Sequence, residues 1–167
     1  MAELILPSGH IALVDDADLP LVTAPGLRWH LTPASKDKNY VGRRWREDGR
    51  YRKQRLHSFL TGWSLVDHIN GDGMDNRRAN LRPATHSQNN CNKGSMRTAS
   101  SQHKGVSLIS RRKSRPWLAQ IKKDRRYFYL GYFDSQDDAA RAYDAAAREL
   151  HGEFAHLNFP TVRTEEW

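Results

Sequence analysis

Residues 65–90, which read LVDHINGDGMDNRRANLRPATHSQNN, hold side chains that could together hydrolyse a phosphodiester bond. Asp67 and His68 are adjacent, Asn80 lies twelve residues after His68, and Asn89 lies nine residues after Asn80. Carboxylate and carboxamide oxygens suit hard divalent cations, so Asp67 and Asn89 are candidate metal ligands, for Mg²⁺ first and Mn²⁺ as an alternative. An imidazole can take a proton from an attacking water, which makes His68 the candidate general base. Asn80 completes the candidate catalytic set, and we expect it to tie the intervening loop by bonding backbone groups.

Several neighbouring side chains admit two interpretations. His57 lies eleven residues before His68 in a strand-like run, and it is either a second catalytic or phosphate-contacting group or a packed, hydrogen-bonded histidine. His86 is an alternative metal ligand in place of Asn89. Three arginines are candidate phosphate contacts, because a guanidinium fork matches phosphate geometry, or they are simply solvated. They are Arg77, Arg78 and Arg82.

This segment resembles the HNH endonuclease family, in the branch whose motif runs DHIN-G-x-x-x-DNR-x-x-NLR-x-x-T-x-x-QN, with Asn89 rather than His at the third motif position. The resemblance implies a ββα-metal fold. LVDH fits the end of the first strand, NGDG (70–73) a tight turn, and DNRRANLR the loop and second strand. The T-x-x-Q pattern from Thr85 to Gln88 predicts the start of a helix. The metal would then lie between a strand end and a helix start.

The composition points to a polyanionic partner. Of the 167 residues 28% are charged and 38% hydrophobic, and the net charge of +8 gives a pI near 9.9. A basic protein of this kind most often binds nucleic acid, although a solvated basic surface is the alternative. The basic residues are unevenly placed: residues 1–50 have no net charge, residues 51–97 carry +5, and residues 98–133 hold nine basic groups against one acidic group. A basic belt therefore runs from about residue 51 to residue 133.

The sequence also predicts where the chain works. Cys91 is its one cysteine, so an internal disulfide and a cysteine-rich zinc site are both excluded. No apolar run reaches membrane-spanning length, and the N-terminus lacks the pattern of a secretory signal. We therefore expect no membrane partner and no small-molecule cofactor, and an intracellular, cytoplasmic protein of a bacterial or phage-infected cell. The sequence leaves the oligomeric state open.

The first half of the chain is expected to be β-rich. ELIL and HIALVD are apolar runs separated by the turn PSGH, and residues 38–60 suggest a second strand pair around the turn EDG (47–49). Three aspartates after the second run could hold a metal, but acidic turn residues are the favoured interpretation. They are Asp15, Asp16 and Asp18.

The second half of the chain predicts three strands and a helix. In WLAQIKK the residues Trp117, Ala119 and Ile121 share one face, and after the turn KDRR, Phe128 and Leu130 are expected on that same face. A helix follows, with Ser135 as N-cap and Gly152 as its stop. Its apolar stripe should pack on this face of the sheet. The stripe consists of Ala140, Tyr143, Ala147 and Leu150.

This second half resembles the Apetala-2/ethylene-response-factor DNA-binding domain. The matching stretches are KGV (104–106), WLAQI (117–121), YLGYF (129–133), AARAYDAAA (139–147) and LNFP (157–160). The resemblance implies a sheet that lies in the major groove of double-stranded DNA with its helix-free face inward. An exposed face with ordinary solvated charges is the alternative. The candidate DNA contacts are Lys104, Ser107, Arg111, Arg112, Lys113, Arg115, Gln120, Lys122, Tyr127 and Tyr129.

Taken together, the sequence predicts an α+β protein in which a ββα-metal (HNH) nuclease module with a β-rich N-terminal extension precedes a three-stranded antiparallel sheet packed on one helix. The expected divisions are 1–54 for the β-rich region, 55–97 for the nuclease module, 98–103 for a linker, 104–160 for the DNA-binding domain and 161–167 for a tail. Mobile HNH endonucleases resemble this combination, which implies a metal-dependent DNA endonuclease of the homing type. The alternative is a sequence-specific DNA-binding regulator whose nuclease module is inactive, and a weaker third option is an RNA-directed nuclease.

Overall fold

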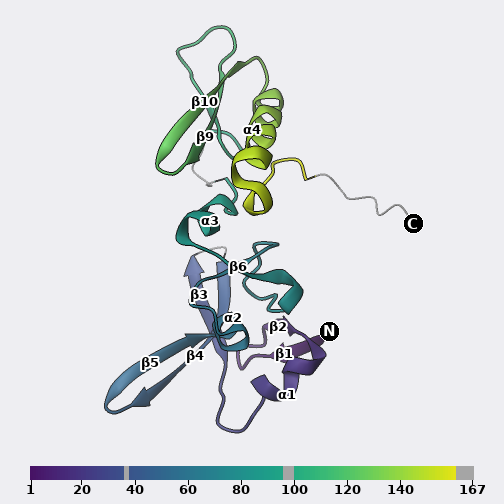
Figure 1. Cartoon of the computed structure of the whole chain (residues 1–167), viewed down its shortest axis with the longest axis vertical. Helices are drawn as coiled ribbons and strands as arrows, with labels where there is room; N and C mark the ends of the chain where they lie inside the picture. Colours follow the sequence, from purple (N-terminus) through teal and green to yellow (C-terminus); the bar gives the residue numbers. More distant parts are fainter. Residues whose placement is uncertain (36–37, 96–99, 161–167) are drawn as a thin grey trace, which may run out of the picture. The chain divides into compact units, whose positions relative to one another are not determined.

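Alternating apolar runs at the N-terminus form the first sheet of the computed structural model, which describes residues 1–35, 38–95 and 100–160 (Figure 1). The described chain divides into two compact units, Met1–His86 and Ser87–Trp167. The expected tail, 161–167, and part of the expected linker, 96–99, lie outside the described residues. Within the parts that are described, no helix is both long and apolar enough to cross a membrane.

The first unit contains three small antiparallel sheets. Strand β1 (Ala2–Ile5) pairs with β2 (Ile11–Val14), as the two apolar runs predict. A short 3-10 helix, η1 (Asp16–Asp18), and α1 (Leu19–Val22) follow. The second sheet has the order β3-β4-β5 and the third has the order β6-β7. These strands are β3 (His30–Ser35), β4 (Lys38–Glu47), β5 (Arg50–Arg55), β6 (Val66–His68) and β7 (Leu81–Pro83).

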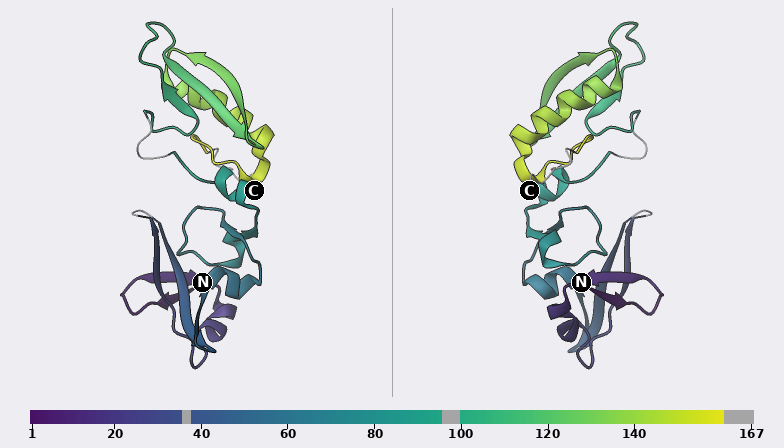
Figure 2. Two further views of the ribbon diagram at one scale, coloured as in Figure 1. Left: turned by 90° about the vertical axis from the view of Figure 1, so that its left-hand side faces the viewer. Right: turned by 90° about the vertical axis from the view of Figure 1, so that its right-hand side faces the viewer.

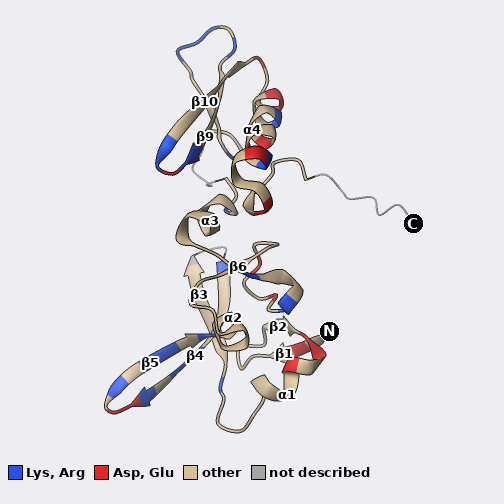
Figure 3. Ribbon diagram, in the orientation of Figure 1, with Lys and Arg blue, Asp and Glu red and all other residues tan. Residues whose placement is uncertain are grey.

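The long β4–β5 hairpin has the turn that the sequence predicts. Asp48 and Gly49 both have positive φ, of 49° and 74°, which suits a two-residue hairpin turn. Figure 3 shows Lys and Arg positions, in blue, along both strands of this hairpin. The chain then enters α2 (Leu56–Thr61) rather than continuing as a strand, so the expectation of a strand-like run around His57 is wrong. The helix forms because Leu56 and Leu60, four residues apart, bury one face in the core, and Gly62 ends it in the left-handed conformation.

The core of the first unit is built from residues of several elements between β1 and α2. The indole nitrogen of Trp29 donates to the carbonyl of Val22 at 2.8 Å, so its polar atom is satisfied inside the core. The described buried residues of this cluster are Leu4, Leu6, Ala12, Val14, Val22, Trp29, Val41, Leu56 and Leu60. The core thus joins the N-terminal sheet, the β4 strand and α2 into one support for the segment that follows.

The predicted order of two strands and a helix is present after residue 65. Strand β6 pairs antiparallel with β7, with η2 (Arg78–Asn80) between them, and α3 (His86–Cys91) begins where the capping-box pattern places a helix. Nearly all of α3 belongs to the second compact unit, whereas the sequence-based division grouped it with the strands before it.

The second unit is a three-stranded sheet with one long helix on its back, as expected (Figure 2). The strands lie in the order β10-β9-β8, and the alanine-rich helix α4 packs on them. Ser135 caps α4 by accepting a hydrogen bond from the Asp138 amide. The elements are β8 (Val106–Leu108), β9 (Trp117–Lys123), β10 (Arg126–Phe133), α4 (Gln136–His151) and η3 (Gly152–Phe154).

A β-bulge in β10 departs from simple alternation. Tyr129 pairs with Gln120 but Gly131 pairs with Ala119, so Leu130 is an extra residue. The bulge directs Phe133 to the helix-covered core and leaves Tyr132 on the same face as Tyr129.

Two expectations for the second unit need correction. Phe128 lies on the helix side by register, but its side chain is 43% exposed, because it lies near the turn of the β9–β10 hairpin. Residues 101–103 were expected to be linker, yet Ser101 and His103 are buried. A His103 ring nitrogen lies 3.0 Å from the Asp137 carboxylate of α4, which fastens this segment to the unit.

Candidate functional site

Strand β6 places Asp67 and His68 inside the first unit, where each is only 5% exposed. Asp67 lies directly opposite Arg82 on β7, and both Nε and Nη2 of the guanidinium donate to Asp67 Oδ2, at 2.9 and 2.7 Å. A buried carboxylate needs such a partner, because an uncompensated charge in the interior is costly. Arg82 therefore has a defined intramolecular role, and its predicted phosphate contact stays a prediction.

Two rings from separate elements lie against the candidate base, His68. The centroid of the His68 ring lies 5.0 Å from that of His57 on α2, in an edge-to-face arrangement. The Tyr40 ring of β4 lies 5.9 Å from His57 and 5.7 Å from His68. The structure thus brings together His57 and His68, as the sequence suggested, and adds Tyr40, which sequence reasoning missed.

Burial keeps both imidazoles neutral near pH 7. It lowers the pKa of His57 to about 3, with the neighbouring His68 and Arg55 adding to the effect. Burial also lowers the pKa of His68, although a side-chain hydrogen bond with Asn76 and the charge of Asp67 oppose this change. A neutral imidazole is the form that can accept a proton, so the surroundings of His68 suit a general base.

Asn80 ties the loop between β6 and β7, as expected. Its Oδ1 accepts from the backbone amide of Asn70 at 3.0 Å. Its Nδ2 donates to Asn70 Oδ1 at 3.0 Å and to the carbonyl of Asp75 at 2.8 Å. These bonds span ten residues of loop, and they show a positioning role. A direct catalytic role for Asn80 stays a prediction.

The other two motif arginines are also paired with carboxylates. The Arg77 guanidinium donates two hydrogen bonds to the Asp75 carboxylate, at 2.8 and 2.7 Å. Hydrogen bonds from this arginine hold the pKa of Asp75 below its usual range. Arg78 binds Asp18 at 2.8 and 2.9 Å, and its backbone amide donates to Asp15. The N-terminal aspartates thus anchor the motif loop to the first sheet. Phosphate contacts by Arg77 and Arg78 stay predictions.

Glycine at position 73 lets the loop approach β4 closely. A Cβ built there would lie 2.3 Å from the Asn39 carbonyl and 2.5 Å from a Tyr40 ring carbon. No side chain fits in that space, so the loop can pack against Tyr40 only with Gly73. The same loop joins β2 through hydrogen bonds of Leu13 with Met74 and Asn76.

The remaining motif residues lie on α3, where Asn89 is half-buried and His86 exposed. Asn89 belongs to the second unit and Asp67 to the first. Among the described residues, no group of three or more His, Cys, Asp or Glu side chains is placed to hold a metal ion. Mg²⁺ commonly takes only one or two carboxylates and completes its shell with water and substrate phosphate, so a donor set of one carboxylate and one amide oxygen fits that ion.

The helix-free face of the second unit displays aromatic and basic side chains. Register places Ser107, Gln120 and Lys122 on this face, opposite to the side of Ala119 and Ile121 that α4 covers. Tyr127 and Tyr129 lie on it too and are 65% and 63% exposed. The structure therefore brings these predicted contacts together on one surface.

The basic loop between β8 and β9 reaches the same face at one point. The Arg112 guanidinium carbon lies 3.9 Å from the centroid of the Tyr132 ring, which in turn contacts Tyr129. Arg111, Lys113 and Arg115 are exposed, and Arg115 lies 3.8 Å from Asp134. The sequence does not indicate Tyr132, because strict alternation assigns it to the core side and only the bulge reverses this.

Lys104 is a predicted DNA contact that the structure directs elsewhere. Its ammonium donates to the carbonyl of Cys91, and burial lowers its pKa to about 8. Its backbone is held by Asn158, which accepts from the Lys104 amide at 2.6 Å and donates to its carbonyl at 3.1 Å. Lys104 therefore holds the end of α3 to the rest of the second unit instead of lying on the sheet face.

Comparison with known proteins assigns part of this chain. Residues 101–153 match the AP2 domain model. The chain is 44% identical over 70 residues, 41% of its length, to dehydration-responsive element-binding protein 2D of Arabidopsis thaliana. It is 54% identical over 55 residues, 29% of its length, to ethylene-responsive transcription factor 3 of Nicotiana tabacum. No solved structure gives a significant match.

A third relative extends further along the chain. An uncharacterized HNH endonuclease of Acanthamoeba polyphaga mimivirus is 37% identical over 115 residues, 64% of this chain. Only 67 residues follow position 100, so this match must also include part of the first hundred residues. The chain spans 32%, 58% and 24% of the length of the Arabidopsis, mimivirus and Nicotiana relatives, respectively.

Proposed function

We propose that this chain is a DNA endonuclease in which the second unit holds double-stranded DNA and the first unit hydrolyses a phosphodiester bond. One observation carries the DNA-binding part: the exposed aromatic and basic face of the β8–β10 sheet lies within the segment that matches the AP2 domain model. A sheet with one face covered by a helix and the other polar and basic can enter the major groove.

The hydrolytic part is supported by the surroundings of His68. A neutral imidazole beside a carboxylate, in a loop fastened by several hydrogen bonds, can accept the proton of an attacking water. His57 and Tyr40 pack against His68 and hold its ring in position. The name of the mimivirus relative agrees with this assignment.

A divalent ion, most simply Mg²⁺, is part of this proposal. Asp67 would hold it, with Asn89 as the second ligand that the motif spacing predicts. When bound, such an ion supplies charge stabilisation at the phosphate. The chain's own residues would orient the water, accept its proton at His68 and hold the motif loop through Asn80.

A second candidate is a DNA-binding regulator that does not cut. The names of the Arabidopsis and Nicotiana relatives, a response-element-binding protein and a transcription factor, favour it. Their matches cover less than half of this chain, however, and they give no role to the two packed histidines of the first unit, His57 and His68.

One assay separates the two candidates. Supercoiled plasmid is incubated with the full chain and Mg²⁺ or Mn²⁺, with and without excess chelator, and scored for nicked and linear forms, while binding of a short duplex is measured in parallel. We expect binding together with cleavage that chelator abolishes. Binding without cleavage under all metal conditions would favour the regulator, and cleavage undiminished by chelator would refute the metal role.

A further inference from the structure

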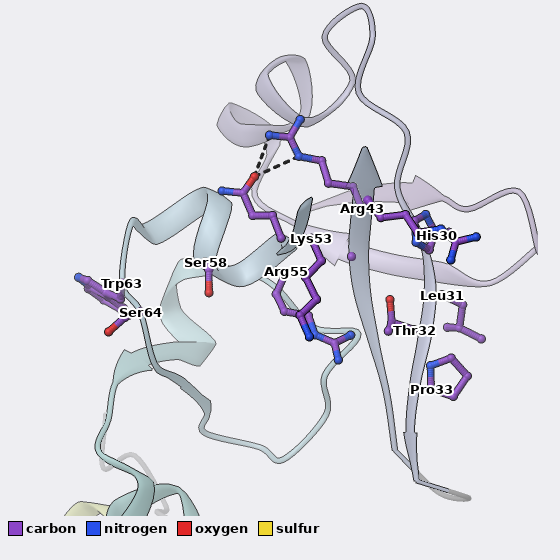
Figure 4. Close-up of a pocket in the computed structure, with 13 residues that line it drawn as sticks. His30, Leu31, Thr32, Pro33, Arg43, Lys53, Arg55, Ser58, Trp63 and Ser64 are labelled. Carbon is purple, nitrogen blue, oxygen red and sulfur yellow. Dashed lines mark hydrogen bonds between the residues drawn. The ribbon is translucent and has the colours of Figure 1, made fainter. Parts of the chain in front are cut away.

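The first unit has a groove that the proposed chemistry does not use. It has a volume of about 790 Å³ and lies over the β3-β4-β5 sheet, with Ser58 of α2 and the segment Trp63–Ser64 on one side (Figure 4). This volume is typical of ligand sites in proteins. The groove lies entirely within the first unit.

Five of the residues that line the groove are arginine, lysine or histidine, and four of them lie on neighbouring strands at one face of the sheet. At one position of the sheet His30 and Arg55 flank Gly42, and two residues further along β4, on the same face, Arg44 lies directly opposite Lys53. Among the described residues that line the groove, none is acidic. Like charges directly opposite each other on one face destabilise a sheet, so this arrangement favours an anion between them.

Gly42 lies between His30 and Arg55 on the sheet, where the surrounding atoms leave no room for a side chain. A Cβ at this position would lie 2.9 Å from Thr32 Oγ1 and 3.2 Å from the Gln54 carbonyl. Only glycine fits there without displacing Thr32 or the neighbouring strand, so no side chain stands between His30 and Arg55.

Arg55 connects the groove to His57 and His68 through the Tyr40 ring. Its guanidinium carbon lies 5.2 Å from the centroid of the Tyr40 ring, which contacts His57 and His68. Arg55 Nη1 is buried and has no hydrogen-bond partner in the described part of the chain. A buried guanidinium donor without a partner is costly, and a phosphate oxygen is the acceptor that matches its geometry.

We propose that this groove binds the sugar–phosphate backbone of the DNA strand that is cut, and delivers it along Arg55 and Tyr40 to His68. The proposal rests on the proposed function. Charge complementarity selects the occupant, because several cations without a carboxylate suit a polyanion. The exposed Arg44 and Lys53 would meet flanking phosphates, and Arg55 would meet the phosphate nearest the histidines.

The test compares two double variants of the full chain. Arg44→Ala/Lys53→Ala removes two exposed groove cations, and Arg28→Ala/Arg50→Ala removes two exposed arginines of the same unit that do not line the groove. Binding of a labelled duplex is measured by fluorescence anisotropy from 50 to 300 mM salt. Each phosphate contact contributes a slope of about −0.9 in log K against log salt. We expect the groove variant to flatten the slope by about one to two units and to slow plasmid cleavage, and the control variant to match wild type.

Each outcome decides a separate question. Equal flattening in both variants would mean that net charge alone matters, and an unchanged slope in the groove variant would mean that DNA does not enter the groove. Either result overturns the inference while the proposed function stands. A wild-type chain that fails to bind DNA refutes both. Thermal unfolding of each variant checks that the fold is intact, and the charge-reversed Arg44→Glu/Lys53→Glu should weaken binding further.

Discussion

The candidate functional side chains of the two units lie in opposite environments. In the first unit Asp67, His68, Asn80 and Arg82 are all less than a tenth exposed, and hydrogen bonds or ring contacts tie them to partners inside the unit. In the second unit the core is largely alanine and aromatic, and charged side chains project from an open sheet face.

The contrast teaches that burial is associated with chemistry and exposure with recognition. Burial lowers the pKa values of His57 and His68, and ring contacts fix their orientations, which suits proton transfer. Exposed arginines and tyrosines can adapt to a phosphate backbone or a base edge.

The sharpest test of the contrast is His68→Ala. A positioned general base contributes roughly 10²–10⁴-fold to a rate, so plasmid cleavage should fall by that factor. Duplex affinity should be unchanged, because a buried neutral side chain adds little to phosphate binding. His10→Ala, at an exposed position in the first unit, is the matched control and should cut at the wild-type rate. Wild-type cleavage by the His68 variant would transfer the role to His57 or His86.

Removal of the buried carboxylate of α4 should destabilise the second unit. Asp144 is 2% exposed and accepts from the amides of Asn158 and Phe159, both at 2.8 Å. Asp144→Ala leaves those donors without an acceptor, so the free energy of unfolding should fall by about 1–3 kcal/mol. Urea unfolding measures the loss, and Glu149→Ala, exposed on the same helix, is the control. A stability equal to wild type would show that these bonds do not hold the C-terminal segment.

The exposed loop of the second unit should govern the salt dependence of binding. Replacement of Arg111, Arg112 and Lys113 together by alanine should flatten the slope of log K against log salt by about one to three units. Affinity should fall similarly for every DNA sequence, since phosphate contacts carry no base information. As a control, Arg148→Ala, at an exposed position on α4, should leave the slope unchanged. An unaltered slope in the triple variant would remove this loop from the DNA path.

The buried histidines should make the first unit sensitive to acid. The pKa of His57 is lowered to about 3 in the fold, so the unfolded chain binds its proton first as pH falls below about 6.5. Stability contributed by neutral His57 is therefore present above pH 6.5 and lost on the way down to pH 3, by at most about 1.4 kcal/mol per pH unit. His57→Gln should make urea stability less dependent on pH between 7 and 5, whereas His10→Gln at an exposed position should not. Identical pH profiles for wild type and the His57 variant would mean that this ring titrates normally.

Much of the fold could be predicted because local patterns agree with the final structure. Alternation in WLAQIKK, the capping residue Ser135 and the apolar stripe of α4 each specify their element without help from distant residues. The spacing of Asp67, His68 and Asn80 likewise indicated the loop that Asn80 holds. His57 was assigned to a strand because the run LHSFL is too short to show helical periodicity, and burial of Leu56 and Leu60 decided its helix.

What the sequence alone determined is therefore the set of chemical groups and the order of the elements. Only the tertiary structure decided which groups meet: Tyr40, far from His68 in the chain, reaches its ring because Gly73 lets the loop pack against β4. In the same way, a single extra residue in β10 moved Tyr132 to the open face. Strand pairing placed Arg44 directly opposite Lys53, two residues along β4 from Gly42. Such meetings depend on register and close packing between distant segments, and no local pattern records them.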